Sequence, residues 1–491
     1  MKRILVLGAG LVSRPMVRYL LNVPDFEVVV ASRTVSKAQE LVGTHPRGKA
    51  VALNVDSDAD LEKQVGGSDL AVSLLPYTYH VKVAGFCLKY KKPLVTTSYV
   101  SDAMRALDAQ AKAAGVILLN EIGLDPGIDH MSAMKIIHDV QKAGGAVASF
   151  MSYCGGLPAP EANDNPLGYK FSWSPKGVVM AGRNDARYLK DGKEVFIPGP
   201  DLFGNRWPLK VADGFEFEAY ANRNSLPYIE TYGLKGVRTM LRGTLRNPGW
   251  CATLKAIADL GVLKDDKVRD GIGKLTPAIW MREYVPARDR KTGTVPQSGR
   301  EAPGTVPGFP ANRVPSQSSL RADVAAKLGL KPTDAIIERF AWLGLFDEKP
   351  IGLEQGSNLD ILARQMLDRM AYKPAERDMI VLHHEFVADM PQASEKMGTV
   401  PSQGPVRLPR TVPGFSERIY STLIAFGEPN GDSSMARTVS LPAAIAARMV
   451  LHGELKLTGV RIPVLPEIYE PVLAELARLG IECKERKIPV S

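Results

Sequence analysis

Short apolar runs alternate with amphipathic segments through residues 1–130. The runs rich in Val, Ile and Leu are Arg3–Leu7, Glu27–Ala31, Ala50–Val55, Leu70–Leu75, Pro93–Thr97 and Val116–Asn120. The segments with helical periodicity between them are Ser36–Val42, Asp60–Val65 and Ser101–Ala114. Because apolar strands that alternate with helices are typical of parallel sheets covered on both faces, the pattern predicts an α/β fold with a Rossmann-like, doubly wound parallel sheet.

The remainder of the chain is less regular. After a predicted helix, Met131–Lys142, residues up to 250 are dense in Gly, Pro, Asn and aromatic residues, as in strands and loops. Further helices are expected at Leu320–Leu330, Asp334–Leu343, Asn358–Met370, Met435–Leu451 and Ile468–Leu479. Asp378–Phe386 is expected to be a strand.

Two stretches rich in Pro, Gly, Ser, Gln and Arg interrupt these patterns, at residues 285–319 and 391–416. They share short repeats, such as Gly293-Thr294-Val295-Pro296 and Gly398-Thr399-Val400-Pro401. Such compositions bury too little apolar surface to offset the entropy of ordering the chain. We therefore expect disordered surface insertions, with a docking role as the alternative.

Length and composition exclude several classes of protein. A chain of 491 residues is too long for one core, so two or three domains are expected. The net charge of +9 is spread along the chain without a nucleic-acid module, so we expect no nucleic-acid partner. Four scattered cysteines without a C-x-x-C pair fit a reducing compartment, here the cytoplasm. Charged residues or prolines interrupt every apolar run, so no membrane span is expected.

The first predicted strand leads into a glycine turn. Gly8 and Gly10 allow backbone N–H groups to approach a pyrophosphate at a helix N-terminus, although Ser13 replaces the third glycine of the usual motif. At the end of the second strand, Ser32-Arg33-Thr34 stands where an NAD site carries an acid. A guanidinium and hydroxyls suit the 2′-phosphate of NADP(H), which is the predicted cofactor.

Polar residues follow the later strands at the edge where parallel sheets bind ligands. Tyr99 and Asp125 could each hydrogen-bond an amine or imine near the nicotinamide. For Asp125, a turn-forming role before Pro126 is an equal alternative. Asp129 is interpreted as a helix cap and His130 as a structural residue.

Cys154 follows in a Gly-rich segment with the composition of a pocket wall. A buried, unreactive thiol is its default interpretation. His383 and His384 are neighbours in a predicted strand, so their side chains point to opposite faces. No metal site is predicted.

Several long motifs resemble one family, the glutamate-forming saccharopine dehydrogenases, also called saccharopine reductases. The motifs are Gly8–Gly10 with Ser13–Pro15, Thr96–Ser101, Asn120–His130, Ser152–Pro160, Asp164–Ser174 and Arg242–Arg246. The resemblance covers nearly the whole chain except the two Pro/Gly-rich stretches.

The resemblance implies an NADP(H)-dependent enzyme of lysine biosynthesis. Enzymes of this family interconvert saccharopine with L-glutamate and 2-aminoadipate 6-semialdehyde through an imine. The resemblance also implies three domains. They are a Rossmann-like domain at 1–130 plus about 420–491, a mixed α/β substrate domain at 131–250 plus about 371–390, and a small all-helical domain at 251–370. A homodimer is possible.

The resemblance further implies site residues. NADP(H) contacts are expected at Gly8, Gly10, Leu11, Val12, Ser32, Arg33, Thr34, Asn54, Val55, Leu75, Pro76, Leu124, Asp125, Pro126 and Ser174. Asn54 departs from the family's aspartate. Substrate contacts are expected at Ser98, Tyr99, Arg223, Arg242, Gly243 and Thr244. Because saccharopine carries three carboxylates, Arg223 and Arg242 suit it. The candidates for orientation and proton transfer are Tyr99, Asp125 and Cys154.

Two other functions stay open at this point. A sister enzyme, such as a carboxynorspermidine dehydrogenase, would reduce an imine formed with a diamine and would need acids to hold the second amine. A non-catalytic NADP-binding sensor or scaffold would use the repeats for docking.

Overall fold

The computed structural model describes residues 1–211, 214–264, 267–287, 317–391 and 415–489. Within them, one sheet has seven parallel strands in the order β17-β6-β5-β4-β1-β2-β3. The strands are β1 (Lys2–Leu7), β2 (Phe26–Ser32), β3 (Gly48–Ala52), β4 (Leu70–Ser73), β5 (Leu94–Thr96), β6 (Ile117–Leu119) and β17 (Gly459–Arg461). The predicted doubly wound parallel sheet is confirmed.

Alternate residues of this sheet enter two different cores. Ile4 and Val6 face one cluster of buried side chains, whereas Leu5 and Leu7 face another. The first face is covered by α1 (Ser13–Leu21), α2 (Val35–Val42), α15 (Ser434–Leu451) and α16 (Pro466–Arg478). The second face is covered by α3 (Asp58–Gly66), α4 (His80–Lys89), α5 (Asp102–Arg105) and α6 (Asp108–Ala114).

The single helix expected at 101–114 is broken into α5 and α6. Asp108 begins α6, and its Oδ1 accepts a hydrogen bond from the backbone N–H of Val460 at 2.9 Å. This bond ties α6 to β17, a strand from the far end of the chain, so local periodicity alone could not show the break.

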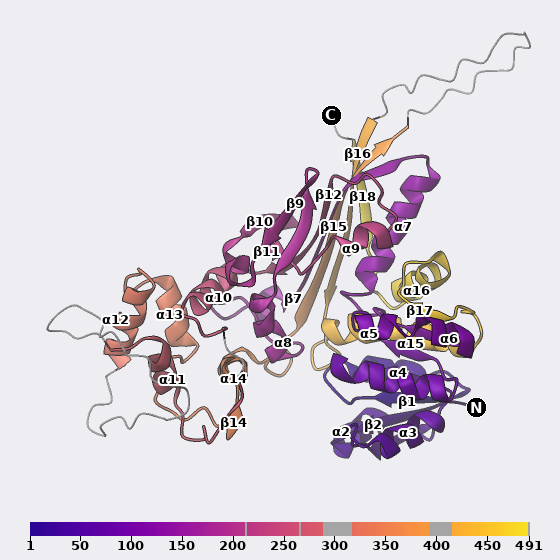
Figure 1. The fold of residues 1–491 in the computed structure, drawn as a ribbon, viewed down its shortest axis with the longest axis horizontal. Helices are drawn as coiled ribbons and strands as arrows, with labels where there is room; N and C mark the ends of the chain where they lie inside the picture. Colours follow the sequence, from indigo (N-terminus) through magenta and orange to yellow (C-terminus); the bar gives the residue numbers. More distant parts are fainter. Residues whose placement is uncertain (212–213, 265–266, 288–316, 392–414, 490–491) are drawn as a thin grey trace, which may run out of the picture.

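A second sheet, of mixed direction, stands beside the first (Figure 1). Its main path in the described residues is β10-β11-β12-β7-β15-β16-β18, and β8 and β9 extend it beside β12. Its strands are β7 (Ala146–Pro158), β8 (Ala186–Lys190), β9 (Lys193–Ile197), β10 (Arg206–Val211), β11 (Phe215–Ala221), β12 (Thr239–Arg246), β15 (Asp378–Met390), β16 (Phe415–Phe426) and β18 (Lys484–Pro489). Only β7 and β12 pair in parallel. α7 (Ile128–Lys142) connects the two sheets.

The end of the chain contributes to both sheets. We expected residues from about 420 to return to the nucleotide domain, and α15, β17 and α16 do lie there. However, β16 and β18 pair in the mixed sheet, and β16 runs antiparallel to β15 along its whole length. This pairing covers an edge of β15 that would otherwise expose unpaired backbone groups.

Most of the remaining helices lie on the side of the mixed sheet that faces away from the parallel sheet (Figure 1). They are α8 (Pro175–Met180), α10 (Trp250–Asp259), α11 (Pro277–Tyr284), α12 (Gln317–Lys327), α13 (Ala335–Trp342) and α14 (Asn358–Met370). A two-stranded ribbon of β13 (Arg269–Asp270) and β14 (Gln355–Gly356) lies among them. Their side chains, such as Leu254 and Phe340, share one core with Leu157 and Leu245 of the mixed sheet. A separate all-helical domain therefore stays a prediction.

Short elements complete the described residues. They are α9 (Pro227–Thr231) and the 3-10 turns Tyr77–Tyr79, Pro160–Ala162, Ala181–Arg183 and Gly199–Gly204. The predicted insertions lie mostly outside the described residues, at 288–316 and 392–414. Their described ends differ from the prediction, since residues 317–319 begin α12 and 415–416 begin β16. Among the described helices, none is long and apolar enough to cross a bilayer.

Candidate active site

The turn after β1 is shaped by both glycines and by Ser13. Gly8 has φ of +112°, and a Cβ there would lie 3.2 Å from the carbonyl oxygen of Leu74. Ser13 Oγ accepts from the N–H of Gly10 and donates to the carbonyl of Gly8, both at 3.1 Å. Ser13 therefore fixes the turn where the usual motif has its third glycine. Gly10 and Leu11 are exposed in front of the turn.

The end of β2 presents basic and hydroxyl groups to solvent. Arg33 and Thr34 are exposed, and no carboxylate in the described ranges forms an ion pair with the Arg33 guanidinium. Beside it, Asn54 Oδ1 accepts the N–H of Asp56 at 3.1 Å and shapes the turn after β3. This surface matches the charge of a nucleotide 2′-phosphate.

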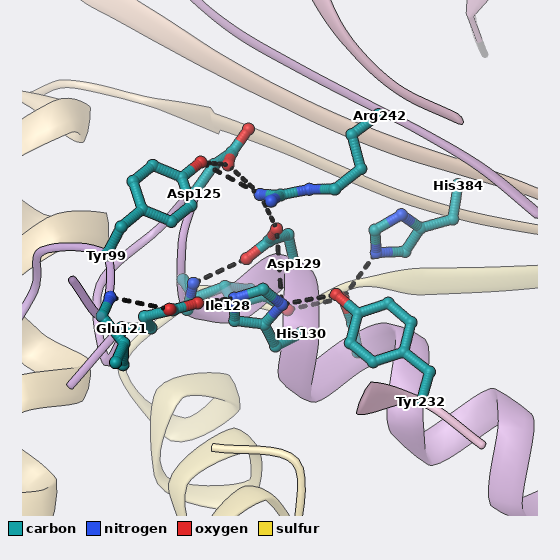
Figure 2. A network of polar contacts seen from close by, with 12 residues as sticks. Tyr99, Glu121, Asp125, Ile128, Asp129, His130, Tyr232, Arg242 and His384 are labelled. Carbon is teal, nitrogen blue, oxygen red and sulfur yellow. Dashed lines mark hydrogen bonds and ion pairs between the residues drawn. The ribbon is translucent and has the colours of Figure 1, made fainter. Parts of the chain in front are cut away.

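A buried polar network lies where the carboxyl edge of the parallel sheet meets the mixed sheet (Figure 2). Tyr99 follows β5 and its Oη donates to Asp125 Oδ1 at 3.0 Å. Arg242, on β12, donates from Nη2 to Tyr99 Oη at 3.2 Å, to Asp125 Oδ1, and to Asp129 Oδ2 at 2.6 Å. One guanidinium on β12 therefore joins Tyr99, after β5, to Asp125 and Asp129, which lie just before α7 and in its first turn.

The network continues into the first turn of α7. Asp129 was expected to cap this helix, but the N-cap is Gly127 and Asp129 is the second residue of α7. Its Oδ1 accepts the N–H of Gly127 at 2.6 Å, and its Oδ2 pairs with Arg242. His130 is fully buried and bonds Glu121 Oε2 through Nε2 at 2.8 Å and Tyr232 through Nδ1. These bonds place His130 in a supporting position behind the two aspartates.

The electrostatics separate the two aspartates. Burial raises the pKa of Asp125, and Asp129 adds to that rise while Arg242 opposes it. Burial acts in the same direction on Asp129, but His130 and Arg242 together hold its pKa below the ordinary value. Asp129 is therefore the charged partner of Arg242, and Asp125 is the carboxyl group that accepts a proton more readily.

Two arginines flank the Tyr99 ring. The guanidinium carbons of Arg242 and Arg223 each lie 5.6 Å from its centroid. Arg223 is exposed and has φ of +53°, whereas Arg242 is 5% exposed and also contacts the Tyr228 ring at 4.5 Å. The structure therefore offers Arg223 to a ligand, while the charge of Arg242 is already matched inside the protein.

The predicted substrate residues Ser98 and Thr244 lie beside this network, whereas Gly243 faces the other side of β12. Ser98 Oγ lies 2.8 Å from Nε2 of the buried His80, whose Nδ1 contacts Ser73 Oγ at 2.9 Å. A Cβ on Gly243 would lie 2.7 Å from the ring of Tyr153, so only glycine fits between β12 and that ring. Thr244 pairs with Cys154 across β12 and β7.

Cys154 lies on β7, close enough to Asp125 and Asp129 for their charges to act on it. Burial raises the pKa of its thiol well above the ordinary value, and the two carboxylates add to that rise. Cys154 is therefore a neutral thiol, which weighs against a nucleophilic role.

Ser174 lies apart from the Arg242 network. It caps α8 by accepting the N–H of Gly177 at 3.2 Å. Its neighbours Trp173 and Pro175 line a cavity of about 620 Å³ together with Leu11 of the glycine turn. The cavity therefore links two predicted cofactor segments.

Comparisons with known proteins decide the family. Residues 4–119 match the family model of the saccharopine dehydrogenase NADP binding domain, and residues 123–481 match that of the saccharopine dehydrogenase C-terminal domain. This chain belongs to the saccharopine dehydrogenase family.

Full-length relatives agree with this assignment. The chain is 38% identical over 495 residues to the saccharopine dehydrogenase (NADP+, L-glutamate-forming) of Saccharomyces cerevisiae, covering 99% of each chain. The mitochondrial alpha-aminoadipic semialdehyde synthase of Bos taurus is 35% identical over 482 residues, 98% of this chain and 47% of that protein.

Solved structures match as well. The apo saccharopine dehydrogenase (L-Glu forming) from Saccharomyces cerevisiae superposes with a TM-score of 0.80 at 37% identity, covering 99% of this chain and 100% of that one. A homospermidine synthase from Legionella pneumophila, with a TM-score of 0.52, 8% identity and coverage of 100% of this chain and 91% of that one, shares the fold alone.

Several residues of this saccharopine dehydrogenase family site were not predicted from the sequence. Glu121 lies inside the Asn120–His130 motif and His80 lies in none of the motifs that resemble the family, and neither was assigned a role. Tyr228 and Tyr232 are one helical turn apart around α9, a spacing that could have suggested a shared face. His384 Nε2 contacts Ser132 Oγ at 2.8 Å, while His383 contacts Thr422 on the other face of β15. The described part of the chain contains no cluster of three or more potential metal-ligating side chains.

Proposed function

We propose that this chain is an NADP(H)-dependent saccharopine dehydrogenase of lysine biosynthesis. In the forward direction the amine of L-glutamate condenses with the aldehyde of 2-aminoadipate 6-semialdehyde and releases water. Reduction of the resulting imine gives saccharopine. The observation that carries the proposal is the Tyr99–Asp125–Arg242 network at the carboxyl edge of a parallel sheet, in a chain similar along its full length to enzymes named for this reaction.

The cofactor would be held at the predicted strand ends. Gly8, Gly10 and the first turn of α1 suit a pyrophosphate, and Arg33 suits the 2′-phosphate. The bound cofactor supplies the hydride that reduces the imine carbon. The residues present fit it, because Gly10 leaves open space and no carboxylate of the described residues neutralises Arg33.

Asp125 is our candidate for holding a proton. Its Oδ1 is bound by Tyr99 and Arg242, whereas its Oδ2 has no hydrogen-bond partner among the described residues. With a raised pKa, Oδ2 can take each of the two protons that the amine nitrogen loses and pass it to the aldehyde oxygen, first as the carbinolamine forms and then as water leaves. Tyr99 and Arg242 keep this carboxyl oriented, and Cys154 stays neutral beside it.

We assign the two predicted substrate arginines different roles. Arg223 is exposed beside Tyr99 and suits a glutamate carboxylate. Arg242 already binds Asp125 and Asp129, so we propose that it positions these residues instead of clamping substrate. We propose that Ser98 and Thr244 also contact the substrate, and that Gly243 lets β12 pack against Tyr153 behind them.

Steady-state turnover tests this function. Purified full-length protein is supplied with NADPH, glutamate and the semialdehyde, and NADPH consumption is followed by absorbance. The proposal predicts turnover that requires both substrates. A matched reaction replaces glutamate with a diamine such as putrescine. Turnover with the diamine and none with glutamate would favour the carboxynorspermidine-type enzyme instead.

We also propose that the enzyme works in the cytoplasm as a homodimer. The four unpaired cysteines support a reducing compartment. Subunit number is measured by size-exclusion chromatography with light scattering, and a monomer would refute the dimer.

A further inference from the structure

Arg246, at the end of β12, is a buried cation that has no ion-pair partner in the part of the chain that the structure describes. It is 5% exposed, and within the described residues only its Nη1 has an acceptor, the carbonyl of Leu245 at 2.8 Å. Its Nε is buried and has no partner there. Glu218 lies opposite on β11 but pairs with Arg206 at 3.1 Å. A buried guanidinium left in this state is costly unless an anion from outside completes it.

Two side chains next to Arg246 also present hydrogen-bond donors without acceptors. Its guanidinium lies 5.0 Å from the ring centroid of Tyr169, 5.5 Å from that of Trp250 and 5.9 Å from that of Tyr220. Tyr169 Oη and Trp250 Nε1 are both buried without a hydrogen-bond partner among the described residues. An indole N–H can only donate, and so can a guanidinium, so this cluster of unpartnered donors matches an acceptor such as a carboxylate.

Arg246 lies on the same face of the mixed sheet as the Arg242 network. Side chains two residues apart on a strand share a face, so Arg242, Thr244 and Arg246 point the same way. Cys154 pairs with Thr244 and shares this face. Thr244 and Cys154 are partly exposed. Both side chains therefore lie on the sheet between the two arginines.

The spacing suits a short aliphatic arm. Four residues along a strand separate the Cα atoms of Arg242 and Arg246 by about 13 Å. In 2-aminoadipate 6-semialdehyde, five bonds of about 1.5 Å join the aldehyde carbon to the carboxyl carbon. In the extended chain these two carbons are roughly 6 Å apart. A hydrogen bond of about 3 Å from Arg246 to the carboxylate adds to this reach.

We propose that Arg246, with Tyr169 and Trp250, binds the α-carboxylate at the far end of the aminoadipate arm and selects substrates that carry it. This assignment rests on the proposed function, because it deepens the substrate recognition of that site. It separates the two halves of saccharopine: the glutamate half lies toward Arg223, and the aminoadipate arm runs along β12 to Arg246.

The test compares two secondary amines as substrates for oxidation with NADP+. One is saccharopine, and the other is N-(5-aminopentyl)glutamate, which lacks only the distal carboxylate. We expect the wild-type enzyme to favour saccharopine in kcat/KM by about 30-fold or more, the usual effect of leaving a buried charge unpaired. Arg246→Met should remove this preference, mainly through KM for saccharopine, and leave the analogue unchanged.

Controls separate this effect from a loss of folding. Arg364→Met, at an exposed position of α14, should leave both substrates unaffected. NADPH affinity, measured by nicotinamide fluorescence, should be the same in wild type and Arg246→Met. If Arg246→Met does not fold, Tyr169→Phe removes only a hydroxyl donor and should lower the preference several-fold.

Two results would overturn the inference. One is a wild-type enzyme that oxidises both amines equally well. The other is a preference that survives in Arg246→Met, or in Tyr169→Phe where Arg246→Met does not fold. A wild-type enzyme that oxidises neither amine would instead contradict the proposed function, and the inference with it.

Discussion

Replacing Arg242 with methionine tests the role of the buried network most severely. The change removes the cation that joins Asp125 and Asp129, along with its contacts to the rings of Tyr99 and Tyr228. Removing one partner of a buried ion pair costs about 3–5 kcal/mol, because the other charge stays buried. Here two carboxylates stay behind, so we expect the upper part of that range at neutral pH.

The loss of stability in Arg242→Met should depend on pH. Without the guanidinium, the raised pKa of Asp125 rises further, and Asp129 loses one of the two charges that hold its pKa down, while His130 remains. A carboxyl group whose folded pKa exceeds its unfolded pKa is destabilising when ionised, and this cost disappears as the pH falls toward the unfolded value. The deficit of Arg242→Met should therefore shrink between about pH 7 and about pH 5, above the ordinary aspartate pKa of about 3.9.

Urea denaturation at the two pH values measures this difference. Arg187→Met is the matched control, since the Arg187–Glu194 pair is half exposed and should contribute about 1 kcal/mol or less. Adding Asp129→Asn to Arg242→Met should recover part of the lost stability by removing one unpaired charge. A deficit at neutral pH no larger than that of Arg187→Met, or one that does not change with pH, would refute the reasoning.

Three further outcomes follow from the site. Arg33→Asp should shift cofactor preference from NADP toward NAD, measured as the ratio of the two kcat/KM values. Lys37→Asp, in the first turn of α2, is the control and should shift the ratio less. An unchanged ratio in Arg33→Asp would contradict the assignment of Arg33 to the 2′-phosphate. Burial lowers the pKa of His80 to about 4. The neutral imidazole is buried in the folded state, so protonation of His80 in the unfolded state should lower the stability as the pH falls from about 6.5 toward 4. His80→Gln should flatten that part of the stability profile, and an unaltered profile would contradict a neutral, buried His80. Cys154→Ala should keep turnover within about tenfold of wild type and the thiol should react slowly with iodoacetamide, whereas a loss of several orders of magnitude would make the thiol a catalytic group.

The parallel sheet could be predicted because its strands and helices carry their own periodicity. Ile4 and Val6 enter one core and Leu5 and Leu7 the other, so the run of apolar residues reports a strand buried on both faces. The placement of β16 could not be predicted in the same way. Its alternating pattern fits any half-buried sheet edge, and only the partner strand β15 decides which sheet it joins.

The sequence identified several residues of the Arg242 network but not how they are arranged. Tyr99, Asp125 and Arg242 lie in recognisable motifs, but Tyr99 and Arg242 are 143 positions apart and their contact depends on the docking of two sheets. An arginine in a sequence shows its charge and not which group neutralises it. Arg242 finds two internal aspartates, whereas Arg246, four residues later, finds none among the described residues.

The most direct test of the proposed reaction is to identify its products. The purified chain is incubated with saccharopine and NADP+, and the amino acids are separated and quantified. Saccharopine can be oxidised on either carbon attached to its secondary amine, and the two choices release different products. We predict L-glutamate and 2-aminoadipate 6-semialdehyde, each in equal amount to the NADPH formed. Release of lysine and 2-oxoglutarate, or no NADPH at all, would contradict the account.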